Sequence, residues 1–342
     1  MTHGTALVQG CTTTCSLCQI LSNASESGPQ ESSGRTEVLQ EAITTGQIAI
    51  AKMGERVEEF PELLTNVGNT FLRRFEHTGD INDISEAIRN YQRAVELSPD
   101  GHADFPTRLT NLGIAFAIRF EHTRDQDDIS KAIRNQQRAV ELTPDGHVDL
   151  PARLTNLGNE FSDRFECNGD LDDISEGIKN YQRVIKLTPD GHAHLPARLT
   201  DLGIAFTTRF ELTGDLEDIT EAIRNHRCAV QLTPDGHPDL PFRLNNLGNA
   251  FEIRFERTGD PDDISEVIQN HQRAVELTPH WHADLATRLI NPGDAFLRRF
   301  ERTEDYQFLS NALSNYRLSA TSSTGPPSIR LNAAKQWVNL SQ

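Results

Sequence analysis

Apolar residues recur along the chain at the spacing of one face of an α-helix, and the stretches come in pairs. Within residues 109–120 they lie three, four and four apart, and residues 129–140 carry a second such stripe. No stretch alternates apolar and polar residues as a half-buried strand does. The pattern therefore predicts a pair of helices and no sheet. The stripes are formed by Leu109, Leu112, Phe116 and Phe120, and by Ile129, Ala132, Ile133, Gln136 and Val140.

This helix pair repeats with a strict period of 45 residues. A short amphipathic pair cannot bury its apolar stripes alone, whereas stacked pairs share a continuous core. The sequence thus predicts an all-α fold, an α-solenoid of stacked antiparallel helix pairs wound into a superhelix, with repeats starting near 61, 106, 151, 196, 241 and 286. The period is marked by Gly68, Gly113, Gly158, Gly203, Gly248 and Gly293 and by Phe75, Phe120, Phe165, Phe210, Phe255 and Phe300.

Polar, proline and glycine residues mark the expected helix ends. In the third repeat Asp149 is expected to cap the first helix, with Pro151 in its first turn. Gly169 is expected to end that helix in a left-handed conformation, and Asp170 to cap the second helix. Pro189 is expected to end the second helix. The recurring Pro-Asp-Gly-His stretch between repeats is therefore interpreted as a turn, in which the histidine has no assigned role.

The segments LTNLGIAF (109–116) and AIRNQQRAVELTP (132–144) resemble the tetratricopeptide repeat (TPR), and the match recurs over 61–320. The unit is 45 residues rather than about 34, with seven of the extra residues between the first Gly and Ala and four in the turn. The recurring LGxxFxxRFExTGDxxD also resembles repeat arrays that precede CHAT (caspase-like) protease domains in fungal proteins. The matching positions are Leu112, Gly113, Phe116, Ala132, Ala139 and Pro144.

The array is expected to span 36–320, opening with a half repeat at 36–53. Residues 1–35 are rich in Ser, Thr and Gly and are interpreted as a disordered tail. Residues 321–342 are expected to form a linker and a closing helix at 328–340.

Three residues depart from the repeat. Arg124 and Glu304 replace the stop glycine, so the left-handed stop is not expected there. Pro292 replaces the leucine of the Leu-Gly pair and is expected to kink or shorten its helix.

Composition excludes several classes of function. The net charge of -17 opposes binding to nucleic acid and to anionic membranes. No apolar run is long enough to span a membrane, and the first thirty residues do not resemble a signal peptide. With five cysteines and no disulfide pattern, the chain is expected to be cytoplasmic.

No catalytic or cofactor site is expected. Cys11, Cys15 and Cys18 have the spacing that holds an iron–sulfur cluster in radical SAM enzymes, but the chain lacks the barrel that surrounds it, so they are interpreted as incidental thiols. The turn histidines are too far apart, one per repeat, to share a metal. The arginine before each recurring phenylalanine is interpreted as structural, forming an ion pair or a helix cap. Nearly every polar residue is copied in the other repeats, whereas a catalytic residue is usually singular, so the chain is predicted not to be an enzyme.

The TPR resemblance implies a binding site on the first helix of each pair, which lines the concave face of such arrays. Contacts there flank the Leu-Gly pair or lie one turn later. Asparagine suits an extended peptide backbone because its amide both donates and accepts hydrogen bonds. A hydrogen-bond ladder between stacked helices explains the same asparagines equally well, and both interpretations stay open. The candidate contacts are Asn66, Asn69, Arg73, Asn111, Ile114, Asn156, Asn159, Asn246, Asn249 and Asn291.

The sequence therefore predicts a non-enzymatic scaffold that binds a protein or peptide, neutral or basic because the chain is acidic. No cofactor, nucleic acid or membrane partner is expected. The alternative is the regulatory repeat arm of a CHAT protease whose catalytic domain is missing from this chain. SIRLNAAKQW resembles the stretch that leads into that domain, and an in-frame His and Cys domain encoded after Gln342 would favour this alternative.

Overall fold

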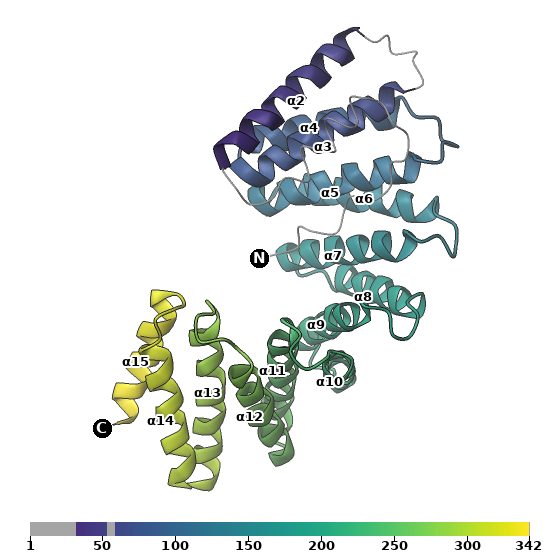
Figure 1. The fold of residues 1–342 in the computed structure, drawn as a ribbon. Coiled ribbons are helices and arrows are strands. Elements are labelled where there is room, and N and C mark those ends of the chain that lie inside the picture. The colour runs from purple at the N-terminus through teal and green to yellow at the C-terminus, as the bar shows by residue number, and fades with distance from the viewer. Residues whose placement is uncertain (1–31, 53–58, 342) are drawn as a thin grey trace. The chain divides into compact units, whose positions relative to one another are not determined.

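The computed structural model describes residues 32–52 and 59–341, and every regular element in these ranges is an α-helix (Figure 1). We call α3, α5, α7, α9, α11 and α13 the A helices and α4, α6, α8, α10, α12 and α14 the B helices. Successive A helices begin 45 residues apart, and so do successive B helices. The helices are α2 (Ser32–Lys52), α3 (Phe60–Thr78), α4 (Ile81–Glu96), α5 (Phe105–Thr123), α6 (Gln126–Glu141), α7 (Leu150–Asn168), α8 (Leu171–Lys186), α9 (Leu195–Thr213), α10 (Leu216–Gln231), α11 (Leu240–Thr258), α12 (Pro261–Glu276), α13 (Leu285–Thr303), α14 (Tyr306–Ala320) and α15 (Pro327–Leu340).

The chain divides into two compact units, Met1–Arg164 and Phe165–Gln342, with the boundary inside α7. In the first unit α3 packs on α4 and α5 on α6, while α4 also packs on α5. In the second unit α9, α11 and α13 pack in the same way on α10, α12 and α14, and each of these B helices packs on the next helix along the chain. The prediction of an all-α fold built from stacked helix pairs is therefore confirmed.

Within a pair, the glycine of the A helix allows the B helix to come close. A Cβ atom added to Gly68 would lie 2.6 Å from the ring of Tyr91, and one added to Gly248 would lie 2.6 Å from the ring of His271. No real Cβ tolerates such a distance, so the large B-helix side chain requires glycine opposite it. The side chains at this B-helix position are Tyr91, Gln136, Tyr181, His226, His271 and Tyr316.

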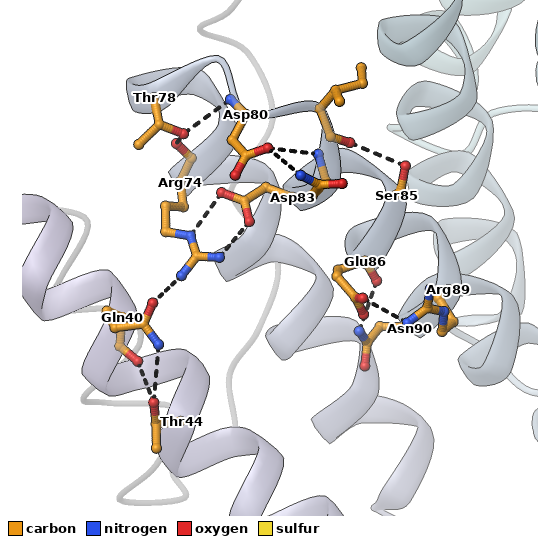
Figure 2. Close-up of polar contacts among 12 residues, drawn as sticks. Gln40, Thr44, Arg74, Thr78, Asp80, Asp83, Ser85, Glu86, Arg89 and Asn90 are labelled. Carbon is orange, nitrogen blue, oxygen red and sulfur yellow. Dashed lines mark hydrogen bonds and ion pairs between the residues drawn. The ribbon is translucent and has the colours of Figure 1, made fainter.

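A buried ion pair also joins the two helices, from the C-terminal part of the A helix to the N-terminal part of the B helix. In the second repeat, Nε and Nη2 of Arg119 donate to the two carboxylate oxygens of Asp128 at 2.7 and 2.6 Å. Figure 2 shows the first-repeat pair, Arg74 with Asp83, where Arg74 also donates to Gln40 on α2. The prediction that these arginines are structural is confirmed. The other pairs described are Arg209–Asp218 and Arg254–Asp263.

The B helices begin and end as predicted. The Asp170 carboxylate accepts a hydrogen bond from the backbone N–H of Asp172 at 3.0 Å, and α8 ends at Lys186, before Pro189. The equivalent caps of the other B helices are Asp80, Asp125, Asp215, Asp260 and Asp305.

The expected cap of the A helices is wrong. The Asp149 carboxylate accepts a hydrogen bond from Nη2 of Arg153 at 3.4 Å. At the equivalent position before α5, α11 and α13 the aspartate makes no side-chain capping bond. Instead, Nδ1 of His147 accepts the backbone N–H of Asp149 at 3.1 Å and so satisfies a donor just before the helix. This bond recurs in every turn between repeats and gives the histidine its role. The equivalent histidines are His102, His192, His237 and His282.

The left-handed backbone conformation that ends the A helices is also present in the two repeats without the glycine. Arg124 and Glu304 have φ of 57° and 56°, close to the 69° of Gly79. The Arg124 N–H donates to the carbonyl of Phe120 at 2.7 Å, as Gly79 does to Phe75. The hydrogen bonds of the repeat therefore impose this backbone conformation on side chains that disfavour it.

Replacing Arg124 by glycine is expected to stabilise the chain, because glycine has no Cβ to strain in this conformation. Loss of the guanidinium, which lies 5.5 Å from the Phe120 ring centroid, offsets part of the gain. We expect a net gain of about 0.5 to 1 kcal/mol, seen as a higher melting temperature. The matched control, Gly214→Arg, should lower the melting temperature. Equal melting of Arg124→Gly and the wild type would contradict the assigned strain.

Pro292 does not shorten its helix. α13 contains 19 residues, the same as α11, and packs on α14 as the other A helices pack on their B helices. The buried ring of Pro292 occupies the position that Leu247 has in α11, so apolar packing is kept although a backbone donor is lost.

Helices flank the repeats at both ends. α2 begins at Ser32, four residues before the half repeat expected at 36–53, and buries Leu39, Ala42 and Ile43. α15 includes the expected closing helix, and its Trp337 and Leu340 pack against the core of the second unit. The rest of the expected tail, with Cys11, Cys15 and Cys18, lies outside the described residues.

Candidate partner-binding face

The candidate contacts lie on the A helices, and each compact unit carries its own set. Asn66, Asn69 and Arg73 are on α3, and Asn111 and Ile114 are on α5. Asn156 and Asn159 are on the part of α7 that belongs to the first unit. The second unit carries Asn246 and Asn249 on α11 and Asn291 on α13, and α9 contacts α11 directly.

Three of the asparagines have uncommitted amides. Among the described residues, the side chains of Asn111, Asn156 and Asn249 make no hydrogen bond within the chain. All three are partly exposed, so water or a partner can reach their amides. They remain free to donate and accept hydrogen bonds at the same time.

Two other candidates are engaged in holding the fold. The Asn69 side chain accepts a hydrogen bond from the Tyr91 hydroxyl at 2.7 Å, which joins α3 to α4. Nδ2 of Asn291 donates to Oδ1 of Asn245 at 2.6 Å, which joins α13 to α11. The second of these bonds is of the inter-repeat kind that the ladder interpretation describes.

The remaining candidates have mixed environments. Asn66 and Asn159 take part in further intramolecular interactions. Nδ2 of Asn246 is buried and has no hydrogen-bond partner among the described residues. Arg73 lies near Glu76, whose pKa is raised by burial although the arginine acts in the opposite direction.

An ion-pair cluster on α11 and α13 was missed as a site by the sequence reasoning. Nη1 of Arg298 lies 2.6 Å from a carboxylate oxygen of Glu252 and 2.8 Å from one of Glu256. Burial raises the pKa of Glu252, and Glu256 and Asp294 raise it further while Arg298 lowers it. One cation thus faces three carboxyl groups. The only signal in the sequence was that residues 252, 297 and 298 vary between repeats.

Little in the described chain points to chemistry. Within residues 32–52 and 59–341, no group of three or more His, Cys, Asp or Glu side chains is arranged to hold a metal ion. Cys167 and Cys228 are free thiols. Within these same ranges no helix has both the length and the apolar character needed to cross a membrane.

Comparisons with protein-family models and with curated proteins give no match. Among solved structures, the chain is similar to the Cut9–Hcn1 hetero-tetramer of the APC/C, with 16% identity and a TM-score of 0.47. The match covers 95% of this chain but only 53% of that one, so this chain spans about half its length.

Two further solved structures have similar scores. YrrB, described as a TPR protein with an unusual peptide-binding site, matches with 14% identity and a TM-score of 0.43, over 68% of this chain and 97% of its own. A putative kinesin light chain from Podosopora anserina, described as having nearly identical TPR-like repeats, matches with 14% identity and a TM-score of 0.45, over 65% and 98%. At these identities no function is transferred from either protein.

Proposed function

We propose that this chain is a non-enzymatic protein-interaction scaffold that binds an extended peptide or protein segment on the faces of its A helices. The observation that carries the proposal is the set of uncommitted amides at Asn111, Asn156 and Asn249. An extended backbone offers alternating N–H and C=O groups, and an amide side chain pairs with both.

The ligand is proposed to be neutral or basic. The chain carries a net charge of -17, which favours cationic segments and repels acidic ones. In the second unit, Glu252, Glu256 and Asp294 surround a single arginine, Arg298, so a lysine or arginine of the ligand would reduce their mutual repulsion.

The test replaces Asn111 and Asn156 by alanine and measures binding of peptides selected from a random library on the wild-type chain. Each lost hydrogen bond is worth about 0.5 to 1.5 kcal/mol, so the double variant should bind about tenfold or more weakly. The melting temperature should stay unchanged, because neither side chain is bonded within the chain.

The matched control is Asn69→Ala, which removes the acceptor of the Tyr91 hydroxyl and should lower the melting temperature. If the Asn111 and Asn156 variant melts earlier and binds peptide as well as the wild type does, these residues belong to a structural ladder. Selected peptides that are predominantly acidic would contradict the proposed charge of the ligand.

A further inference from the structure

Two residues on neighbouring helices of the first unit depart from the repeat together. Where the other repeats have an aromatic ring on the B helix, α6 has Gln136. Where the other A helices have alanine or threonine, α7 has Glu160. Gln136 and Glu160 lie against each other with exposed fractions of 0% and 3%, and the Gln136 amide acts on the Glu160 carboxyl group. Nε2 of Gln136 donates a hydrogen bond to the Thr110 carbonyl at 3.5 Å. The smaller Gln136 side chain leaves the space that the larger Glu160 side chain fills, so the two departures compensate in volume.

Each of the two side chains has a buried oxygen without a hydrogen-bond partner. Among the described residues, neither Oε1 of Gln136 nor Oε2 of Glu160 is hydrogen-bonded, although both atoms are buried. Two acceptors cannot pair with each other, and a buried unpaired acceptor is unfavourable. A proton on Glu160 Oε2 converts it to a donor that can pair with Gln136 Oε1. Together with a hydrogen bond from the Gln136 amide to the other oxygen of Glu160, this bond would close a two-hydrogen-bond ring between acid and amide.

Among the described residues, no cation acts on Glu160 to favour its ionised form. Positive side chains on the packed helices have partners elsewhere, among them Arg119 of α5 with Asp128, Lys131 of α6 with Asp127, and Arg153 of α7 with Asp149. Arg164 of α7 lies over the Phe161 ring. The charged group that does act on Glu160 is Asp163, which is also negative and opposes ionisation.

We propose that Glu160 is protonated in the folded chain and forms an acid–amide pair with Gln136, so that a bound proton helps to hold α7 on α6. Burial, with a smaller contribution from Asp163, raises the pKa of Glu160 well above its usual value, in agreement with the unpaired oxygens. The folded chain then binds a proton that the unfolded chain releases above about pH 4.5. This contribution to stability is complete below that pH and is lost as the pH rises toward the folded-state pKa. The proposal is independent of partner binding.

The test is Glu160→Gln in the full chain, because the amide reproduces both hydrogen bonds of the protonated acid without titrating. Hydrogen exchange of peptides from 126–164 is compared between variant and wild type at the same pH. We expect equal protection near pH 4.5 and at least about tenfold greater protection of the variant near pH 8. Near pH 6 the infrared absorbance of protonated carboxylic acid should be stronger in the wild type than in the variant, because only the wild type has the Glu160 acid.

A second variant tests the pair in another way. Gln136→Tyr with Glu160→Ala restores the combination present at Tyr91 and Ala115, and should remove the pH dependence as Glu160→Gln does. If protection of the wild type relative to both variants is the same at every pH, Glu160 is ionised in the folded chain and the proposal is overturned. Equal infrared absorbance of protonated carboxylic acid in the wild type and Glu160→Gln near pH 6 would overturn it independently.

Discussion

Lowering the pH from about 6.5 to about 4.5 is expected to destabilise the second unit, Phe165–Gln342, much more than the first. The cause is two buried histidines, His226 on α10 and His271 on α12, whose rings pack against Gly203 and Gly248. Nδ1 of His226 and both ring nitrogens of His271 have no hydrogen-bond partner among the described residues. Protonation would therefore bury a positive charge without compensation.

The lowered pKa values of the two histidines determine the direction in which stability changes with pH. Burial alone lowers the pKa of each histidine from 6.5 to about 4. The unfolded chain thus takes up a proton near pH 6.5 that the folded chain does not, and stability is lost as the pH falls through this window. A shift of this size corresponds to about 3 kcal/mol for each histidine at full effect. The first unit has Tyr91 and Gln136 at the same positions, and neither titrates in this range.

Tryptophan fluorescence measures the stability of the second unit, and a double variant serves as the control. Both tryptophans, Trp281 and Trp337, lie in the second unit, so their fluorescence follows the unfolding of that unit by urea at each pH. The control variant combines His226→Gln with His271→Tyr. Residues 226 and 204 are the repeat equivalents of Gln136 and Ile114, so glutamine at 226 restores a combination that the chain already contains. Tyr91 bonds Asn69, and a tyrosine at 271 would be placed equivalently to Asn249. Equal loss of stability in wild type and variant over this window would contradict the role of the histidines.

The repeat allowed much of the fold to be predicted. The apolar stripes and the recurring glycine, aspartate and proline residues mark helix pairs, because each is a local requirement that recurs from repeat to repeat. Errors arose where tertiary hydrogen bonds override local preference. Arg124 keeps the left-handed stop because its N–H is bonded to the Phe120 carbonyl, and His147 takes the capping role assigned to Asp149. Residue type alone does not predict either arrangement.

The candidate site was less predictable, because equivalent residues have different partners in different repeats. Asn69 bonds Tyr91 of its own repeat, whereas its equivalent Asn249 has His271 in place of that tyrosine and remains uncommitted. Glu160 and Gln136 stand out in a comparison of repeats, but their meaning needs burial and hydrogen bonds in three dimensions. The sequence therefore identifies the candidate positions on the A helices. The contacts within and between repeats determine which of these side chains are free to bind a ligand.

Asp128→Ala is expected to lower the stability of the first unit by about 3 kcal/mol, because it leaves the Arg119 guanidinium without its buried partner. The Asp128 side chain is 2% exposed and that of Arg119 is 24% exposed, so water can compensate only part of the loss. The substitution also removes a negative charge from the first turn of α6, where the helix dipole favours it. Thermal melting and hydrogen exchange of peptides from α5 and α6 measure the effect.

The sixth repeat shows how the same arginine position is accommodated without the carboxylate. There Phe308 stands in place of the aspartate, and the Arg299 guanidinium lies 4.9 Å from the centroid of its ring and donates to Ser265 at 2.6 Å. We therefore expect Asp128→Phe to be less destabilising than Asp128→Ala, and Arg119→Met with Asp128→Ala to be less destabilising than the sum of the single changes. Additive losses would show that the two side chains stabilise the fold independently, and that the repeated ion pair is not the link between the A and B helices.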